Sequence, residues 1–391
     1  MNKTLEAALL LAGTAIGSGM ISLPIVLAKF GIFGSILIML AFATLTYATA
    51  CIRADLNLQT KAKATLGEVG KIFACPHVGI LGDLCLQLLS FALMSAYLFG
   101  GASILGTFFD IQITTIILLF SCMVTSLLLF ASKLILRLNK TMFVMMFTLL
   151  IIQVISLLSQ VSISTIPSAK SDIQLNDWAT LVPIIFTSFG FQGSIHSVTK
   201  FCNNDRHSIQ KACFWGSFIP AIIYIIWTAA ILLVLANTDT KFFQSMLCEE
   251  SIEVGALIQA LSRVFSIEIT QFSIKIISFL AILTSVFGVG LALSDILRRK
   301  YNLSKVLSVL FVTVIPTVVA ILIPNAFLRI LNFSGILLAI IAIIVPTLIS
   351  VKMRNSQTLK SINLLLSNRL ILAIIFALGV TIIVLGCLEW L

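Results

Sequence analysis

The stretch GTAIGSGMISLP, Gly13 to Pro24, lies inside the first long apolar run of the chain and places three glycines within seven positions. Glycine disfavours a helix interior and proline removes a backbone donor, so we expect a helix that is interrupted in its middle. Such an interruption leaves N–H groups without partners at the start of the second half and C=O groups at the end of the first. The N–H groups of Ser18 and Gly19 suit a carboxylate, whereas the C=O groups near Gly13 to Ile16 suit a cation or an ammonium group. Together they predict a site for an amino acid zwitterion.

A second apolar run, VPIIFTSFGFQGSIHSVTKF, repeats this pattern with Ser188, Gly190 and Gly193 near its centre. Backbone that is broken at mid-membrane is tolerated only where it lines a cavity or is buried in protein. Paired interruptions at matching positions of two oppositely oriented halves indicate an inverted-repeat transporter. The alternative, for the first run alone, is a close-packing helix face made by Gly13 and Gly17.

The composition identifies the elements that must position these groups. The chain is 59% hydrophobic and 10% charged, with a mean hydropathy of +1.14, so we expect an all-α polytopic membrane protein. We predict one transporter domain over residues 1–391, with inverted repeats at about 5–162 and 178–350, and an amphipathic surface helix at 252–264. The spans, about eleven in number, are predicted at 5–28, 32–52, 79–106, 112–131, 141–162, 178–199, 212–236, 268–296, 305–323, 327–350 and 370–390.

The positive charges predict the orientation. If the N-terminus is cytoplasmic, all but six of the 25 Lys and Arg residues fall on cytoplasmic ends and loops. The net charge of +10 is therefore a topology signal and requires no nucleic-acid partner. An odd number of spans then places the C-terminus on the periplasmic side. The six exceptions are Lys29, Lys170, Lys241, Arg263, Lys275 and Arg329.

Several classes of protein are disfavoured. The chain has only three His residues, no HExxH or GxSxG motif, and no paired carboxylates within the spans, so we do not expect an enzyme. Its eight Cys residues are scattered without a CxxC pair, so we expect no disulfide framework, no cofactor and no metal beyond a possible sodium ion. A channel would need a continuous polar pore, and only two spans are interrupted.

The two interrupted runs, together with KACFWGSFIPAIIYIIW, resemble the amino acid–polyamine–organocation superfamily, and within it the bacterial hydroxy- and aromatic-amino-acid permeases. The resemblance implies a five-plus-five inverted-repeat fold in a bacterial inner membrane. It also implies secondary active import of aromatic amino acids, with L-tyrosine as the first candidate, by proton or sodium symport. A carrier of tryptophan or of serine and threonine, or a sodium-coupled amino acid symporter, remains the alternative.

The resemblance also implies roles for individual residues. The amides of Ser18 and Gly19 would bind the substrate carboxylate, and Phe191 would lie along the substrate ring. The ammonium group would be received by the carbonyl groups of Ala15, Ile185, Phe186 and Ser188. Tyr97 is a further pocket candidate, although Tyr is also common at membrane interfaces. The candidate substrate-binding residues are Ala15, Gly17, Ser18, Gly19, Tyr97, Ile185, Phe186, Ser188, Phe191 and Gln192.

A candidate cation site lies in the span FLAILTSVFGVG, where Ala281, Thr284 and Ser285 show an A-x-x-T-S spacing. Superfamily members that use sodium resemble this pattern, with two further carbonyl groups from the first interruption, here those of Gly13 and Ile16. The alternative is that both hydroxyl groups simply bond back to carbonyl groups of their own helix.

Proton coupling would need an ionisable group at membrane depth. Some proton-coupled relatives place a Lys in the fifth span, but TMFVMMFTLLIIQVISLLSQ contains no ionisable residue. The relay candidates are therefore His196, Lys275 and Glu6, although Lys275 could instead extend to the interface. The tyrosine permeases place a His at the position of Gln192 and a Pro at that of His196, so this chain departs from their proton route.

Overall fold

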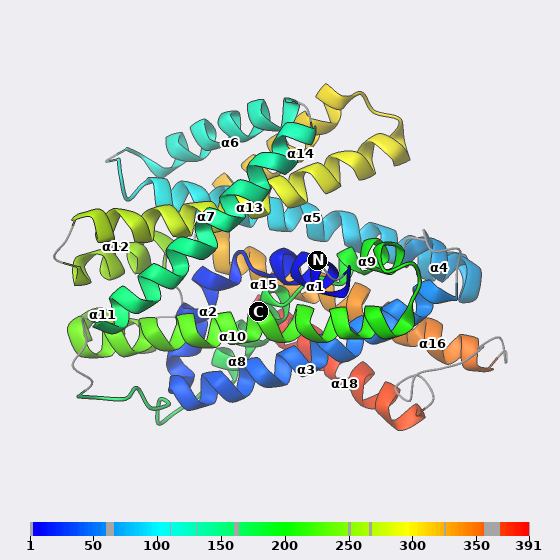
Figure 1. The fold of residues 1–391 in the computed structure, drawn as a ribbon, viewed down its shortest axis with the longest axis horizontal. Coiled ribbons are helices and arrows are strands. Elements are labelled where there is room, and N and C mark those ends of the chain that lie inside the picture. The colour runs from blue at the N-terminus through cyan, green and yellow to red at the C-terminus, as the bar shows by residue number, and fades with distance from the viewer. Residues whose placement is uncertain are drawn as a thin grey trace.

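The computed structural model describes residues 3–59, 66–109, 111–130, 132–159, 164–248, 252–265, 268–323, 326–355 and 368–390. Within these ranges the regular secondary structure is helical, as predicted, and most long helices run along the long axis of the molecule (Figure 1). The elements in chain order are α1 (Lys3–Ala15), α2 (Gly19–Leu27), η1 (Ala28–Phe30), α3 (Gly31–Leu58), α4 (Leu66–Phe73), α5 (Pro76–Leu105), α6 (Ile113–Leu129), α7 (Ser132–Ser159), α8 (Leu175–Ser188), η2 (Gln192–Ser194), α9 (Ile195–Phe201), α10 (Arg206–Thr238), α11 (Thr240–Cys248), α12 (Val254–Val264), α13 (Glu268–Tyr301), α14 (Lys305–Leu322), α15 (Ala326–Ala339), η3 (Ile340–Ile344), α16 (Val345–Asn355) and α18 (Arg369–Leu388).

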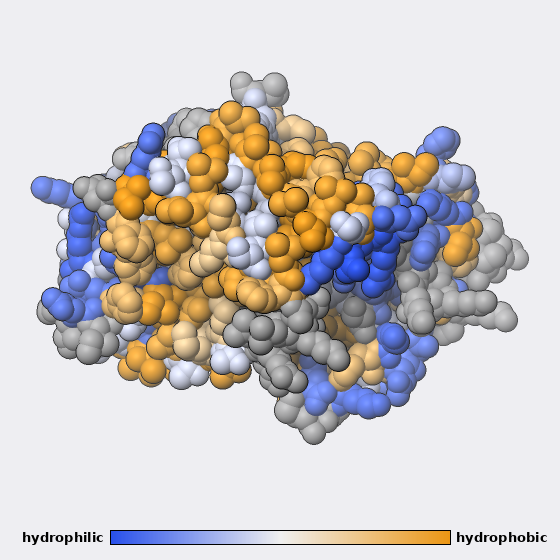
Figure 2. All heavy atoms as spheres, turned by 90° about the horizontal axis from the view of Figure 1, so that it is seen from above, coloured by the Kyte–Doolittle hydropathy of each residue, from blue (hydrophilic) through white to orange (hydrophobic). Residues whose placement is uncertain are grey.

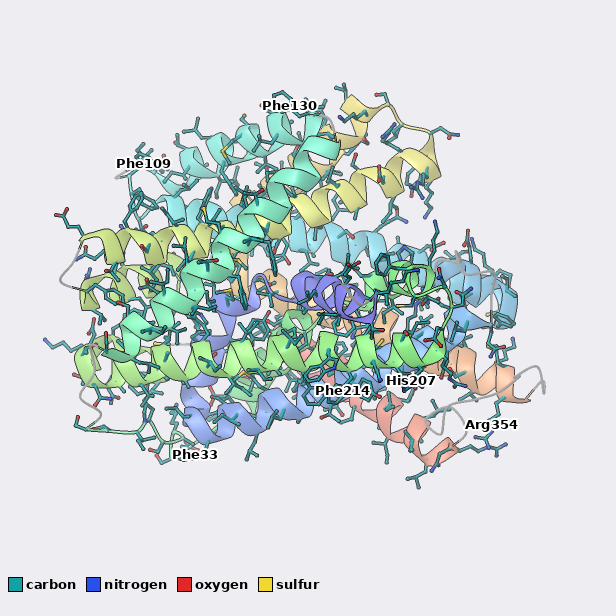
Figure 3. The ribbon with its side chains drawn as sticks, viewed as in Figure 1. Phe33, Phe109, Phe130, His207, Phe214 and Arg354 are labelled. Atoms are coloured by element: carbon teal, nitrogen blue, oxygen red, sulfur yellow. The ribbon has the colours of Figure 1, made fainter. Side chains whose placement is uncertain are left out.

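The surface is that of a multi-pass membrane protein. Among the described residues, eight helical stretches are long and apolar enough to cross a membrane by length and composition. Hydrophobic atoms cover the middle of the molecule and hydrophilic atoms gather toward its two ends (Figure 2). Phe33, Phe109 and Phe130 are exposed and point away from the helices, as lipid-facing side chains do (Figure 3). Every predicted span coincides with one helix or a pair of helices, while the count of about eleven crossings and the inverted repeat stay predictions.

The helix α10 extends beyond its predicted span because a polar cap, rather than the edge of the apolar run, fixes its start. The helix α10 begins at Arg206, well before the predicted start at residue 212, because the Asp205 carboxylate accepts a hydrogen bond from Ser208 N at 3.0 Å. Hydrogen bonds from the side chain and backbone of Ser208 hold the pKa of Asp205 below its ordinary value.

Both predicted interruptions are present. Residues 16–18 separate α1 from α2, and residues 189–194 separate α8 from α9, with the short η2 between them. A third irregularity was not predicted: the π-helical turn η3 joins α15 to α16 within the predicted span 327–350. Gly379 of α18 approaches this turn so closely that a Cβ atom there would lie 2.6 Å from Ile343 Cγ2.

The predicted helix at 252–264 forms as α12, but its apolar face does not lie on an open surface. Val254, Leu257 and Leu261 are almost fully buried, and α12 packs against α5, α10 and α13. The sequence showed the amphipathic period, but it could not distinguish a lipid surface from a protein surface as the apolar partner.

The two ends of the molecule differ in charge. One end carries α4, α9 and α16, the first turn of α10 and the last turn of α13, where Arg298, Arg299 and Lys300 lie; we term it the basic end (Figure 1). The other end carries α11 and α12, and we term it the opposite end. Between the ends, α1 packs against α10, and α8 packs against α2 and α15, so both interrupted helices are central.

Candidate functional site

The first interruption leaves backbone donors without partners in the protein interior. The last helical bond of α1 runs from Ile16 N to Ala12 O at 2.9 Å. None of the hydrogen bonds among the described residues uses the N–H group of Ser18 or Gly19 as a donor. Because Ser18 is only 4% exposed, these two N–H groups form a buried donor pair of the kind that binds a carboxylate.

At the second interruption, the first two residues after α8 still donate backbone hydrogen bonds to the helix. Phe189 N donates to Ile185 O at 3.2 Å, and Gly190 N donates to Thr187 O at 2.9 Å. The Ile185 carbonyl, which was predicted to receive an ammonium group, therefore already accepts a hydrogen bond from the backbone. The neighbouring carbonyl groups of Phe186 and Ser188 follow on the same terminal turn of α8.

The two interruptions face each other. Ser22 Oγ and Ser188 Oγ are 3.4 Å apart and either can donate. The approach near Gly19 leaves no room for a side chain, because a Cβ atom there would lie 2.8 Å from Ser188 Cβ. Glycine at this position therefore allows the backbone of α2 to reach the end of α8.

Tyr224 of α10 links both interruptions. Its hydroxyl group lies 2.8 Å from Ala15 O and 3.1 Å from Ser188 O, both of which were predicted to receive an ammonium group. The hydroxyl also interacts with the backbone of Gly17. The Tyr224 ring meets the Phe189 ring edge to face, with centroids 5.4 Å apart. The phenol thus occupies the centre of the predicted site.

Sequence reasoning did not identify Tyr224 or its neighbour Trp227, whose Nε1 donates to Met20 O at 2.6 Å. A signal was available in the stretch KACFWGSFIPAIIYIIW, which carried only the family resemblance. Two aromatic residues with hydrogen-bonding groups stand three positions apart there, on one face of an otherwise apolar helix. Buried Tyr and Trp need partners, so this spacing predicts a polar feature at membrane depth.

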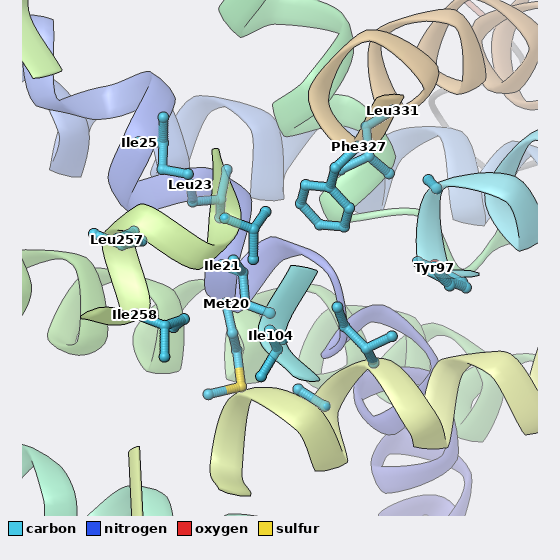
Figure 4. Close-up of a cluster of buried hydrophobic side chains, with 14 of the residues drawn as sticks. Met20, Ile21, Leu23, Ile25, Tyr97, Ile104, Leu257, Ile258, Phe327 and Leu331 are labelled. Carbon is cyan, nitrogen blue, oxygen red and sulfur yellow. The ribbon is translucent and has the colours of Figure 1, made fainter. Parts of the chain in front are cut away.

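Tyr97, a predicted pocket residue, lies beside the first interruption. It is buried, and its hydroxyl interacts with the side chains of Ser18 and Ser285, which join α5, the first interruption and α13 at one point. Met20 and Ile21 of α2 belong to a cluster of buried hydrophobic side chains that also includes Phe327 of α15 (Figure 4).

The candidate cation ligands Ala281, Thr284 and Ser285 are joined to one another by hydrogen bonds. The hydroxyl groups of Thr284 and Ser285 each donate to Ala281 O at 3.0 Å, so both bond back to their own helix. Ser285 and Ala281 lie beside Gly17. Gly13 belongs to α1, and a Cβ atom there would lie 3.4 Å from the Phe143 ring of α7. The structure thus brings Ala281 and Ser285 to the first interruption at Gly17.

The candidates of the second interruption point in different directions. Phe186 belongs to the cluster around α15 and α18, and its ring centroid lies 6.4 Å from that of Phe42. Phe191 is 1% exposed and packs in a cluster with Ala15 and other residues of α1. Gln192 turns toward α3, where its Nε2 donates to Thr49 Oγ1 at 3.3 Å.

The three proton-relay candidates do not meet. His196 Nδ1 lies 2.8 Å from the Gly193 carbonyl, which can only accept, so this nitrogen carries the proton. Lys275 donates to Thr107 O at 2.9 Å near the end of α5 and lies over the Phe108 ring, away from the interruptions. Glu6 is in the first turn of α1.

An ion pair joins the two interrupted segments at the opposite end. Lys29 Nζ of η1, directly after α2, donates to Asp177 Oδ1 in the first turn of α8 at 2.7 Å. Burial acts to raise the pKa of the Asp177 carboxyl group, but the bonds from Lys29 and from Gln174 N outweigh it and hold this pKa below its ordinary value. Lys29 and Asp177 line a cavity of about 470 Å³ together with Arg329 and Glu389.

No group of three or more His, Cys, Asp or Glu side chains among the described residues could hold a metal ion. The groups gathered at the interruptions are instead backbone donors, backbone acceptors and hydroxyl groups, which suit a small zwitterion.

Comparisons with known proteins agree with this arrangement. The family described as the tryptophan/tyrosine permease family matches residues 1–386. The tyrosine-specific transport system 1 of Haemophilus influenzae is 28% identical over 339 residues, covering 84% of this chain and 82% of that protein. Glutamine transporter 2 of Aliivibrio fischeri is 27% identical over 341 residues, covering 83% of this chain and 82% of that protein. Among solved structures, MhsT in complex with L-phenylalanine aligns with a TM-score of 0.63 at 14% identity over 98% of both chains, which shows a shared fold.

Proposed function

This chain belongs to the tryptophan/tyrosine permease family, and from that premise we propose that it is a secondary active transporter that imports L-tyrosine by ion symport. It is a permease and not an enzyme. The observation that carries the proposal is the meeting of the two interruptions, where the unpaired N–H groups of Ser18 and Gly19 lie close to the carbonyl groups of Ala15 and Ser188. One buried site therefore offers complementary groups to both charges of an amino acid.

The substrate carboxylate accepts hydrogen bonds from the N–H groups of Ser18 and Gly19 at the start of α2. The ammonium group of the substrate donates to the carbonyl groups of Ala15 and Ser188, with Phe186 O as a further acceptor. A carbonyl oxygen has two lone pairs, so Tyr224 can keep its bonds to the first two while the substrate binds. The Tyr224 hydroxyl then orients these acceptors.

The aromatic ring of the substrate lies between α5 and the second interruption. Tyr97 and Phe191 supply aromatic contacts there, and Gln192 supplies a polar group for a ring hydroxyl. Offset or edge-to-face contacts of this kind contribute about 0.5–1.5 kcal/mol beyond burial.

The name of one relative motivates a second candidate substrate. The glutamine transporter of Aliivibrio fischeri is almost as similar to this chain as the tyrosine transport system. Backbone groups recognise only the part that all amino acids share, so the side-chain contacts decide between tyrosine, tryptophan, glutamine, serine and threonine.

Two routes of ion coupling are open to this chain. A proton would be carried through His196, with Glu6 and Lys275 as further ionisable groups near the ends of the spans. A sodium ion would be bound by Ala281 O and the hydroxyl groups of Thr284 and Ser285, together with carbonyl groups of the first interruption at Gly13 and Ile16.

The charge distribution supports a topology in which the basic end faces the cytoplasm of a bacterial inner membrane. The N-terminus is then cytoplasmic, the C-terminus is periplasmic, and about eleven crossings form two inverted repeats and a final helix. The two repeats rock about the shared site to give alternating access.

Uptake of radiolabelled tyrosine into proteoliposomes tests the proposal. We expect accumulation under an imposed proton or sodium gradient, and competition by unlabelled tyrosine that is stronger than that by tryptophan, glutamine, serine or threonine. Accumulation without any ion gradient would refute symport. Stronger competition by glutamine than by tyrosine would identify glutamine as the preferred substrate.

A further inference from the structure

A polar seam runs from the second interruption toward the basic end, between α3 and the segment η2–α9. Gln192 Nε2 donates to Thr49 Oγ1 at 3.3 Å. Arg53 lies one turn beyond Thr49 on α3, so its side chain shares the helix face that Gln192 contacts. His196 follows Gln192 by four residues, at the start of α9, and the charge of Arg53 acts on its ring.

Three buried polar atoms along the seam have no hydrogen-bond partner: Thr46 Oγ1, Gln192 Oε1 and Arg53 Nη1. Arg53 is 6% exposed, and none of the ion pairs among the described residues includes it. The acid closest in sequence, Asp55, pairs instead with Arg206 at 3.2 Å. A buried cation without a partner is costly, so this arrangement calls for a bound group that supplies negative charge.

We propose that Arg53 anchors a carboxylate-binding subsite on this seam, which receives the carboxylate of the transported amino acid as it leaves the central site. This identification of the carboxylate rests on the proposed transport function. The planar guanidinium group offers parallel N–H groups that match a carboxylate, and the Thr46 hydroxyl can add a third bond. Gln192 Oε1 is an acceptor, and it suits the ammonium group of the same molecule.

The position of the seam fits a step in release. Gln192 directly follows Phe191 at the second interruption, and its side chain turns toward Thr49 of α3, so the seam begins at the interruption and continues along α3 toward the basic end. A halide ion would satisfy Arg53 but would leave the Gln192 acceptor without a donor. An amino acid satisfies both.

A binding measurement tests the subsite independently of transport. The thermal unfolding midpoint of the purified full-length protein is measured with sodium acetate and with sodium chloride at equal ionic strength. We expect acetate to raise the wild-type midpoint by about 2 °C above chloride, because ligands that bind only the folded state stabilise it. Arg53→Met should lose this shift without lowering the midpoint in chloride, and Arg53→Lys should reduce the shift.

Arg298→Met is the matched control, because Arg298 lies at the same end but is exposed and lies 3.9 Å from Asp295. It should keep the acetate shift. The subsite would be refuted by equal midpoints in acetate and chloride for the wild type, by a shift that survives in Arg53→Met, or by a strong destabilisation of Arg53→Met in chloride, which would show a structural role.

A transport measurement tests the source of the carboxylate. In proteoliposomes, Arg53→Lys should bind tyrosine at equilibrium within twofold of the wild type but release it toward the basic end about tenfold more slowly. Equal losses in binding and release would place Arg53 in the central site and overturn the release step. If the wild type does not carry tyrosine at all, the proposed function fails, while the acetate measurement still decides whether the subsite exists.

Discussion

The hydroxyl oxygen of Tyr224 lies 2.8 Å from the carbonyl oxygen of Ala15, across 209 positions of sequence. The same hydroxyl reaches Ser188 O at 3.1 Å. A side chain of an uninterrupted helix thereby ties together the ends of two interrupted helices. The two interruptions are thus parts of one site, and the geometry of that site depends on α10.

Tyr224→Phe should weaken this connection while keeping the ring contact with Phe189. The carbonyl groups of Ala15 and Ser188 would lose a buried donor, so we expect the free energy of unfolding to fall by about 1–3 kcal/mol. Tyrosine affinity should change as well, because the acceptors would no longer be oriented. Thermal unfolding and equilibrium binding of the purified protein measure the two effects.

Tyr301→Phe is the control, since Tyr301 is exposed and its hydroxyl donates to Gln87 Oε1 at 3.1 Å, away from the interruptions. It should alter neither measurement appreciably. Equal effects of the two variants would show that the link between the interruptions has no special role.

The ion pair between Lys29 and Asp177 should hold the opposite end closed. Asp177→Asn leaves the half-buried Lys29 without its partner, so we expect a loss of about 3 kcal/mol in unfolding free energy. Asp295→Asn removes the partner of an exposed pair and should cost less than about 1 kcal/mol. Similar losses of unfolding free energy in both variants would contradict a closing role of the Lys29–Asp177 pair.

The same pair predicts a pH dependence. Because the folded state lowers the pKa of Asp177, its contribution to stability is complete above the ordinary carboxyl pKa of 3.8 and is lost as the pH falls through the lower folded value. The difference in unfolding midpoint between wild type and Asp177→Asn should therefore stay constant from pH 8 to pH 5 and shrink below pH 3.8. A difference that already shrinks near neutral pH would assign the effect to another group.

If sodium drives transport, Ser285→Ala should raise the sodium concentration for half-maximal uptake, because it removes one oxygen beside Gly17. Ser278→Ala provides a matched control, as Ser278 makes the same kind of back-bond, to Ile274 O at 2.9 Å, on the same helix. Uptake against sodium concentration measures both variants. An unchanged sodium dependence in Ser285→Ala would exclude Ser285 as a sodium ligand.

The interruptions could be predicted because their cause is local. Clustered glycines within an apolar run weaken a helix wherever it lies, so Gly13–Gly19 and Ser188–Gly193 indicated both breaks in advance. The positions of most helices followed from hydrophobic runs for the same reason. The start of α10 did not, because the capping residue Asp205 fixes it.

The tertiary part of the site could not be predicted from local patterns. Tyr224 meets Ala15 only because α10 packs along α1, and Lys29 meets Asp177 across 148 positions of sequence. The spacing of Ala281, Thr284 and Ser285 fitted an ion site and a set of back-bonds equally well, and the hydroxyl groups make the back-bonds. Pairings over such distances are set by packing of the whole bundle.

The most direct test of the central claim is tyrosine uptake by Gly19→Ala and by Gly288→Ala, at matched amounts of protein in proteoliposomes. A Cβ atom at Gly19 would lie 2.5 Å from the Tyr224 hydroxyl and would disturb the meeting point of the interruptions, whereas one at Gly288 would meet nothing within 4 Å. We predict that Gly19→Ala loses at least about tenfold in uptake, as roughly 1.4 kcal/mol of lost binding would produce, while Gly288→Ala stays within twofold of the wild type. Uptake at the wild-type level by Gly19→Ala would contradict the assignment of the amino acid site to the two interrupted helices.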